Sequence, residues 1–227
     1  MLQDSVFIRS EGDRWFDRNR AALEVFQAGS DLPLKLLELY DLRPERALEI
    51  GAANGFRLAA IEKRSGGQVV AVEPSAQAIA DGMTKFPCVH FVRGTANHLP
   101  LKRRFELIIV NFVFHWIDRA NLLCVVSEID RLLEDGGFLI IGDFQPVNRL
   151  RVPYHHLENG AVRTYKQNYA EVFLASGMYH SVSFLTGHHA AKKLDPRSNE
   201  QERIAAWLLR KDMQGHYVEM EMSGHRA

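Results

Sequence analysis

A run of small residues, Glu49-Ile50-Gly51-Ala52-Ala53-Asn54-Gly55, joins an apolar segment to a helix-like one. Gly51 and Gly55 let a ligand come close to the backbone, and a helix that begins here points free N–H groups at it. Glu73 ends the next apolar segment, from which a carboxylate can reach the ribose of a nucleotide in a βα unit. The pattern predicts a site for a nucleoside-containing cofactor.

The spacing within this turn separates two kinds of cofactor. A dinucleotide site needs glycine at the first, third and sixth positions, where this sequence has Gly51, Ala53 and Phe56. The bulky Phe56 would keep the helix from packing closely beside a pyrophosphate. Glu49, two residues before Gly51, favours a ligand that carries positive charge. The residues therefore favour a cationic cofactor, with NAD as the alternative.

Three later segments carry a family resemblance; they are Arg93-Gly94-Thr95-Ala96-Asn97-His98-Leu99-Pro100, Phe105–Trp116 and Leu132–Ile141. Together with the turn and Glu73, they resemble the class I, Rossmann-like S-adenosylmethionine-dependent methyltransferases of the small-molecule type over roughly residues 47–144. The resemblance implies S-adenosyl-L-methionine as the cofactor. It also implies the cofactor contacts, which are Glu49, Gly51, Ala53, Gly55, Glu73, Pro74, Thr95, Ala96, Asn111 and Phe112.

Two of these positions depart from the family pattern. Ala53 replaces the middle glycine of the turn, which is a mild change. Thr95 replaces the aspartate that holds the adenine amino group in the family. A hydroxyl can still accept that hydrogen bond, but without a charge, and the backbone of Ala96 serves in either case.

Histidines are the candidates for acid–base chemistry. Methyl transfer to a hydroxyl needs a base near neutral pH, whereas an amine or a thiolate needs only alignment. His115 follows the fourth predicted strand, at the edge where ligands bind in open α/β sheets, and is the first candidate base. Its alternative role is packing beside Trp116. His155, in a later loop, is the second candidate.

Rings and polar groups predict a wall for the substrate. Most of them lie in an irregular, Pro- and His-containing stretch, residues 145–169, which we predict to be the substrate loop. The predicted substrate residues are Trp15, Trp116, Asp143, Tyr154, His156, Tyr165 and Tyr169. No metal is expected, because the adjacent pairs His155-His156 and His188-His189 point apart and lack ligand spacing.

The elements that must position these residues alternate between short apolar runs and helical stretches, which is typical of an α/β fold with a doubly wound, mostly parallel sheet. The predicted parallel strands are Ala47–Ile50, Val69–Val72, His90–Val92, Leu107–Asn111 and Phe138–Gly142. The predicted helices between them are Asn54–Arg64, Ser75–Met83 and Asn121–Leu133.

The ends of the chain complete a predicted sheet of seven strands. Helices at Ser10–Gln27 and Asp31–Tyr40 make residues 1–40 an N-terminal extension, which either closes over the site as a lid or docks on the core. Residues 41–227 are then the Rossmann-like methyltransferase domain. Its last predicted elements are a helix at Tyr169–Ser176, a strand at Ser181–Thr186, a helix at Asn199–Met213 capped by Ser198, and a strand at Tyr217–Met222.

Composition restricts the partners. Lys and Arg number 28, as do Asp and Glu, so no overall charge attracts nucleic acid or a membrane surface. No leader or membrane-spanning segment is recognised, and Cys88 and Cys124 suggest no disulfide, so we expect a cytoplasmic monomer or homodimer. The predicted function is methyl transfer to a small polar metabolite such as a sugar or sugar nucleotide. The alternatives are a non-catalytic S-adenosylmethionine-binding regulatory protein and an NAD-dependent oxidoreductase.

Overall fold

The structure is a computed structural model that describes residues 3–26, 28–157, 162–191, 193–197, 201–215 and 217–218. Its centre is a parallel sheet in the order β3-β2-β1-β4-β5. These strands are β1 Arg46–Ile50, β2 Gln68–Glu73, β3 Val89–Arg93, β4 Phe105–Asn111 and β5 Leu133–Phe144. The predicted parallel strands are thus confirmed, and the order reverses between β1 and β4, where open α/β sheets bind ligands.

Antiparallel strands extend the sheet beyond β5. β10 Arg203–Lys211 pairs with both β5 and β8 Tyr179–His188, and β9 Lys193–Leu194 adds a short edge, so that the described residues give a sheet of 8 strands. The predicted helix at Asn199–Met213 is therefore wrong for the segment that forms β10. β10 is buried along most of its length, so it lacks the alternation by which a strand is recognised.

Two other predictions at this end fall wholly or partly outside the described residues. Ser198, the predicted cap, and residues 219–222 of the predicted last strand lie outside the described residues. Tyr217 and Val218 belong to no strand. The strand predicted at Ser181–Thr186 is confirmed as part of β8, so the predicted seventh strand is supplied by β10.

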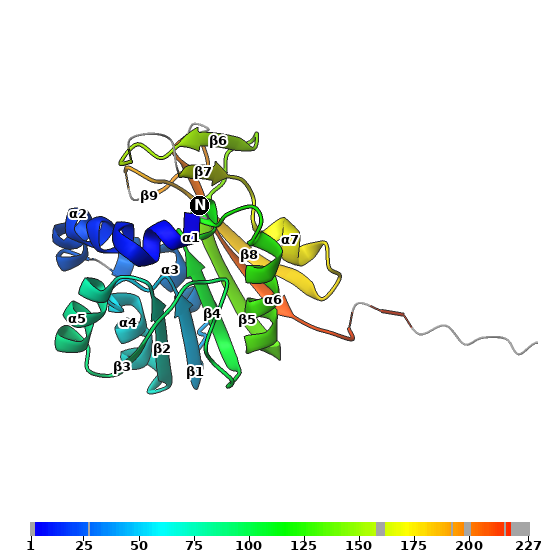
Figure 1. The fold of residues 1–227 in the computed structure, drawn as a ribbon. Coiled ribbons are helices and arrows are strands. Elements are labelled where there is room, and N and C mark those ends of the chain that lie inside the picture. The colour runs from blue at the N-terminus through cyan, green and yellow to red at the C-terminus, as the bar shows by residue number, and fades with distance from the viewer. Residues whose placement is uncertain are drawn as a thin grey trace, which may run out of the picture.

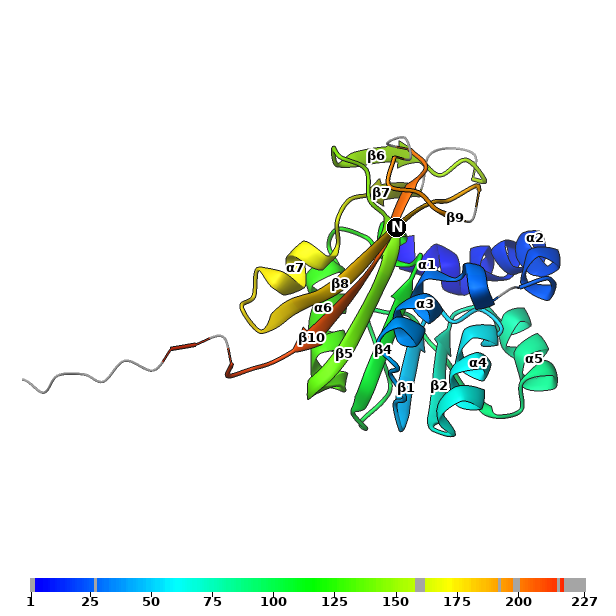
Figure 2. The same ribbon diagram turned by 180° about the vertical axis from the view of Figure 1, so that it is seen from behind.

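Helices cover both faces of the sheet (Figures 1 and 2). Leucines of α3 Leu32–Leu39 and apolar residues of α4 Phe56–Ser65 share one core cluster with the β1, β2 and β4 side chains on that face. The α6 Leu122–Leu132 and α7 Ala170–Leu174 helices supply the other cluster. α5 Ala76–Lys85 begins at Ser75, whose side chain accepts a hydrogen bond from the Ala78 N–H.

The N-terminal segment lies across the end of the sheet, beside a β-hairpin from the second half of the chain (Figure 1). It consists of α1 Gln3–Val6, the π-helical η1 Phe7–Glu11, α2 Gly12–Glu24 and the short 3-10 helix η2 Ala28–Ser30. The hairpin pairs β6 Leu150–Pro153 with β7 Arg163–Lys166, so the stretch predicted as irregular contains regular structure.

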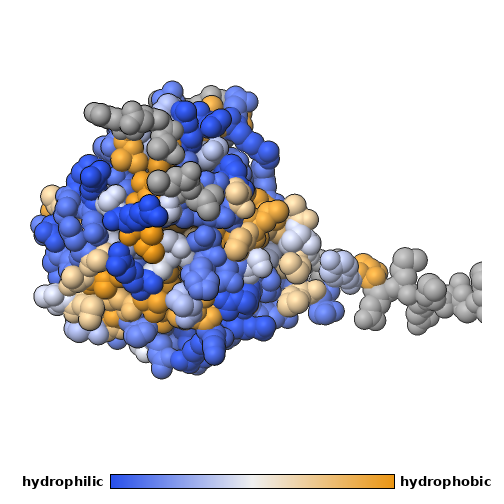
Figure 3. All heavy atoms as spheres, in the orientation of Figure 1, coloured by the Kyte–Doolittle hydropathy of each residue, from blue (hydrophilic) through white to orange (hydrophobic). Residues whose placement is uncertain are grey.

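The amide of Gln3 joins this segment to the hairpin. Its Nε2 donates to Arg163 O at 3.1 Å and to Trp116 O at 2.9 Å, while its Oε1 accepts from Arg163 N at 2.6 Å. On the face of the molecule shown in Figure 3, hydrophilic residues lie between the exposed apolar residues. Among the described residues, no helix is both long and apolar enough to cross a membrane.

Candidate functional site

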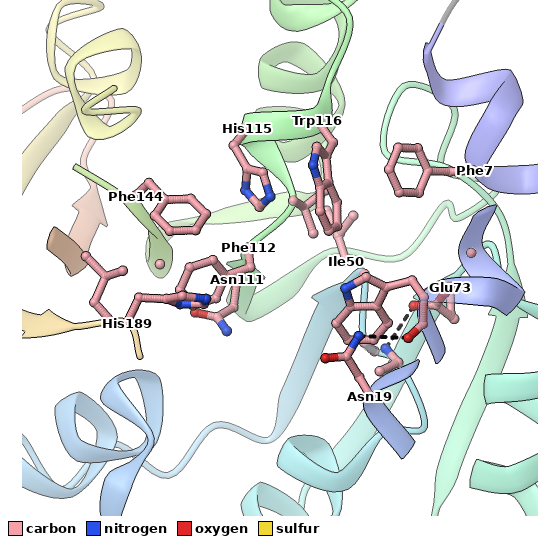
Figure 4. Close-up of a pocket in the computed structure, with 18 of the residues that line it drawn as sticks. Phe7, Asn19, Ile50, Glu73, Asn111, Phe112, His115, Trp116, Phe144 and His189 are labelled. Atoms are coloured by element: carbon pink, nitrogen blue, oxygen red, sulfur yellow. Dashed lines mark hydrogen bonds between the residues drawn. The ribbon is translucent and has the colours of Figure 1, made fainter. Parts of the chain in front are cut away.

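A cavity of about 950 Å³ opens where the carboxyl ends of β1, β2 and β4 meet the N-terminal segment and the β6–β7 hairpin. Glu73 and Asn19 lie toward one end of the cavity, and Phe144 and His189 toward the other, with His115 and Trp116 between them (Figure 4). The predicted residues that line the cavity are Trp15, Gly51, Ala53, Glu73, Pro74, Thr95, Ala96, Asn111, Phe112, His115, Trp116, Tyr154, His155 and His156.

The turn after β1 has the backbone that its small residues predict. Gly51 has φ +72°, and a Cβ there would lie 2.3 Å from Val113 Cγ2. Gly55 has φ +79° and precedes α4. Ala53 also takes a left-handed conformation, with φ 49°, although it carries a side chain. The turn therefore brings its backbone to the cavity at a cost in strain.

Glu73 holds this turn in place from the end of β2. Its Oε2 accepts from Ala53 N at 2.8 Å, and its Oε1 accepts from Ser75 N at 2.9 Å. Burial of the carboxyl raises its pKa to about 7, although the two N–H groups oppose that shift. A carboxylate can accept further hydrogen bonds, so Glu73 can still take a ligand hydroxyl.

Glu49 belongs to a buried ionic group behind the turn. Arg57 Nη1 donates to Glu49 Oε1, while Arg57 Nη2 donates to Asp31 Oδ2 at 2.8 Å. Glu49 Oε2 is buried without a hydrogen-bond partner, and burial raises the pKa of Glu49 to about 7 against the opposing effect of Arg57. Arg57 and Asp31 line the cavity, whereas Glu49 does not.

The carboxyls of Asp31, Glu49 and Glu73 thus surround the turn together with the guanidinium of Arg57. When ionised they outnumber that cation, so this end of the cavity suits a cationic ligand and disfavours a pyrophosphate. A dinucleotide, whose pyrophosphate is anionic, would need the opposite charge at this end of the cavity.

Thr95 and Ala96 form the neighbouring wall. Thr95 Oγ1 donates to Asn97 Oδ1 at 2.6 Å, which leaves the hydroxyl oxygen able to accept from a ligand. Ala96 is buried in the core cluster and also lines the cavity. A polar acceptor therefore stands beside an apolar surface.

Asn111 and Phe112 occupy the end of β4. A Cβ on Gly142 would lie 2.0 Å from Asn111 Oδ1, so only glycine leaves room for this amide. Phe112 has φ 57°, and its N–H donates to Gly142 O at 2.7 Å. The sequence thus places a second non-glycine residue in the left-handed region on the cavity wall.

His115 is held by Asp143, which ends β5 with Phe144. The distance from His115 Nδ1 to Asp143 Oδ1 is 2.8 Å, and His115 N donates to Asp143 Oδ2 at 3.1 Å. Both side chains are buried, but His115 lines the cavity and Asp143 does not. With Nδ1 bonded to the carboxylate, Nε2 is the ring nitrogen left for a ligand, which is the arrangement of a carboxylate-oriented general base.

Tyr154 connects the hairpin to the N-terminal segment above the cavity. Its hydroxyl donates to Glu11 Oε1 at 2.8 Å and accepts from Arg18 Nη2 at 2.9 Å. Burial, reinforced by Glu11, raises the pKa of the Tyr154 phenol. Trp116 stacks on Phe7 with ring centroids 4.9 Å apart. These contacts close one side of the cavity with rings.

Five predicted site residues do not line the cavity; they are Glu49, Gly55, Asp143, Tyr165 and Tyr169. Tyr169 instead stacks on Phe114 in the core, with ring centroids 5.0 Å apart, and donates to Tyr165 O at 2.5 Å. Arg119 lies over the Tyr165 ring, 4.3 Å from its centroid. Neither tyrosine therefore lines the cavity: Tyr165 lies in β7 against Arg119, and Tyr169 precedes α7 and packs in the core cluster of that face.

The family model described as a methyltransferase domain matches residues 48–141, which carry the turn, Glu73, Thr95, Asn111 and His115. Residues 48–141 are thus similar to a methyltransferase domain. An uncharacterized methyltransferase of Alkaliphilus oremlandii is 27% identical over 105 residues, 46% of this chain and 48% of the relative. An uncharacterized methyltransferase of Synechocystis is 29% identical over 92 residues, which are 40% of this chain and 43% of the relative. The chain spans about half the length of these curated relatives.

Solved methyltransferase structures share the whole fold. The Burkholderia thailandensis 1,6-didemethyltoxoflavin-N1-methyltransferase, bound to 1,6-didemethyltoxoflavin and S-adenosylhomocysteine, has a TM-score of 0.68 at 18% identity, covering 92% of this chain and 88% of its own. The N-methyltransferase NodS from Bradyrhizobium japonicum, with S-adenosylhomocysteine, has a TM-score of 0.61 at 14% identity, covering 93% and 99%. The Rossmann-like methyltransferase architecture therefore extends beyond the matched domain.

Several cavity residues were not among the site residues expected from the sequence; they are Phe7, Asn19, Asp31, Arg57, Phe144, His189 and Lys193. Asp31 caps α3 and Arg57 lies on α4, so each reads locally as an ordinary helix residue. His189 and Lys193 come from a turn and a short strand that carry no motif, whereas Lys166 lies in the predicted substrate loop, residues 145–169. Among the described residues, no group of three or more His, Cys, Asp or Glu side chains could hold a metal ion.

Proposed function

We propose that this protein is an S-adenosylmethionine-dependent methyltransferase that acts on a small polar metabolite. The observation that carries the proposal is the acidic surrounding of the turn, where Glu73 and the Asp31–Arg57–Glu49 group meet at the reversal point of the sheet. The cofactor's sulfonium and ammonium are both cationic, which this charge balance favours. The methyltransferase domain match over residues 48–141 supports the same assignment.

The chain offers a partner for each part of this cofactor. Glu73 would accept from the ribose diol, and the Thr95 hydroxyl and the Ala96 backbone would contact the adenine. Asp31 and Arg57 carry the charges that match an ammonium and a carboxylate, so we assign them the amino-acid end. Asn111 and Phe112 would then lie toward the reacting end.

His115 is the proposed base. When bound, S-adenosylmethionine supplies an electrophilic methyl group, and the sulfur that loses it keeps the bonding electron pair. His115 Nε2 receives the proton that a hydroxyl acceptor releases, and Asp143 holds the ring through Nδ1. His155, exposed on the cavity rim, is the second candidate in the proposal.

Residues 1–40 act as the lid in this proposal, over a domain formed by residues 41–227. Gln3 and Tyr154 support it, because they join the N-terminal segment to the hairpin of the substrate loop, residues 145–169. Such a lid keeps water from the reacting methyl group and aligns the acceptor. The equal numbers of acidic and basic residues support a substrate other than nucleic acid. We also place the protein in the cytoplasm as a monomer or homodimer.

Calorimetry with S-adenosylhomocysteine and NAD tests the cofactor. We expect saturable binding of the first only, weakened by Glu73→Gln and unchanged by Glu62→Gln, the same substitution on α4 outside the cavity. Transfer of a labelled methyl group into a cell-extract metabolite then tests catalysis. Tighter binding of NAD would refute the assignment, and cofactor binding without transfer to any metabolite would leave a regulatory protein in its place.

A further inference from the structure

We propose that the methyl acceptor is a small aromatic or heteroaromatic acid whose anionic group is bound by Lys166. This inference rests on the proposed function, because it concerns the end of the cavity remote from Glu73. It deepens the expectation of a polar metabolite by assigning both a charge and a ring to it.

Phe144 brings the groups at this end together. Its ring centroid lies 5.2 Å from that of His115 and 4.9 Å from that of His189, and Lys166 Nζ lies 4.0 Å from the same centroid. Phe112 packs edge-on against it at 5.3 Å. Because the proposed base and Lys166 both contact one ring, a ligand of one or two rings can reach both.

Lys166 is a partly buried ammonium with donors to spare. Its Nζ donates to Gln201 O at 3.0 Å, which uses one of three N–H groups. Burial lowers the pKa of Lys166, and the nearby carboxylates of Glu202 and Asp143 oppose this shift without reversing it. Neither carboxylate lines the cavity. An anionic oxygen in the cavity would replace the water that Lys166 has lost.

The rest of this end has the same character. Lys193, which pairs with His188 in the strand next to His189, also lines the cavity and adds a second ammonium. Besides Asp31 and Glu73 at the turn, the acidic side chain among the described cavity residues is Asp4, which accepts from Asn121 Nδ2 at the start of α6. A cationic acceptor would meet Lys166 and Lys193, which disfavours it.

The wall also favours a ring over a sugar. Around Lys166 it presents the faces and edges of Phe112, Phe144 and His189. A sugar ring would need several hydrogen-bond partners for its hydroxyls, whereas aromatic side chains hold flat rings through stacked and edge contacts. A phosphate carries the same kind of charge as a carboxylate, so the experiment compares an aromatic carboxylate with a sugar phosphate.

Binding of matched probes tests the proposal with the full chain saturated with S-adenosylhomocysteine. The probes are 4-hydroxybenzoate, its neutral analogue 4-hydroxybenzamide, and glucose 1-phosphate, followed by ligand-observed NMR. We expect the acid to bind about tenfold more tightly than the amide, the worth of one charge-assisted hydrogen bond. Lys166→Met should remove that preference, and Lys166→Arg should keep it. Lys63→Met, at an exposed position on α4, is the matched control.

The outcomes distinguish this inference from the proposed function. Unchanged affinity for S-adenosylhomocysteine in Lys166→Met shows that the fold and the cofactor site are intact. Equal binding of acid and amide, or no binding of either, overturns the inference and leaves the methyltransferase assignment standing. Preferential binding of glucose 1-phosphate overturns the aromatic part. Failure to bind S-adenosylhomocysteine at all removes the proposed function itself.

Discussion

The side-chain oxygen of Asn111 occupies the space beside Gly142 so closely that a Cβ on Gly142 would lie 2.0 Å from it. Gly142→Ala should push Asn111 out of its place at the end of β4. We expect S-adenosylhomocysteine affinity to fall about tenfold and the free energy of unfolding to fall by about 1–3 kcal/mol, as for an overpacked site. Calorimetry and urea unfolding measure the two. Gly29→Ala, which meets nothing within 4 Å, is the control; equal losses in both variants would contradict the assignment.

Asp31 should distinguish between ligands with and without an amino acid. Asp31→Asn keeps an N-cap for α3 but removes the charge that faces Arg57. We expect affinity for S-adenosylhomocysteine to fall about tenfold, while 5′-methylthioadenosine, which lacks the amino acid, binds as before.

The matched control for this prediction is Asp41→Asn. Asp41 pairs with Arg64, on the same helix as Arg57, at 2.7 Å, but it lies outside the cavity. Asp41→Asn should leave the affinities for S-adenosylhomocysteine and 5′-methylthioadenosine unchanged. An equal loss for the two ligands in Asp31→Asn would mean that Asp31 only supports the fold.

Glu73 should make cofactor binding depend on pH. Its pKa is raised from 4.5 to about 7, so the folded state holds the Glu73 proton more tightly than the unfolded state. The resulting stabilisation is fully present below pH 4.5 and is lost as the pH rises through about 7. Cofactor binding needs the ionised carboxylate, so its affinity should rise with pH where the contribution to stability falls. We expect S-adenosylhomocysteine to bind about tenfold more tightly near pH 8 than near pH 6, as one titrating group requires.

Glu73→Gln tests which carboxyl titrates, since the pKa of Glu49 is also raised to about 7. Calorimetry at both pH values should show a nearly flat response in this variant. Retention of the full pH dependence would instead assign the titration to Glu49.

His115→Ala should slow methyl transfer to a hydroxyl acceptor by about a hundredfold or more, the usual contribution of a general base. Asp143→Asn should slow it as well, because Asp143 acts by holding the His115 ring. Initial rates of labelled methyl transfer measure both, with His90→Ala at an exposed β3 position as control. An unaltered rate in His115→Ala would point to an acceptor that needs only alignment.

The parallel half of the sheet was predictable because each strand is a short apolar run closed by a turn residue. Ala47–Ile50 and Leu107–Asn111, for example, lie within β1 and β4. β10 was not predictable, since Ala205-Ala206-Trp207-Leu208-Leu209 is rich in helix-forming residues and is buried on both faces. Its strand conformation comes from pairing with β5 and β8.

The site divides in a similar way. Glu73 and the Gly51 turn belong to a local pattern, so the sequence places them on the cavity. Arg57 was missed because Glu49 on β1 and Asp31 at the start of α3 meet it only in the folded chain. Lys166 and His189 meet at Phe144 only after β7, β8 and β5 are assembled. Contacts between residues so far apart in the sequence leave no local pattern from which they could be predicted.

The bonds of the N-terminal segment imply an order of assembly during folding. Gln3 meets Arg163 across 160 positions, and Glu11 meets Tyr154 across 143. Contacts between such distant residues gain nothing until the intervening chain is in place, so they form after β1 to β5. On the ribosome, the N-terminal segment must wait for partners that are synthesised much later. The binding chamber is therefore completed only after the hairpin has formed, and a ligand that binds the completed chamber stabilises the folded chain.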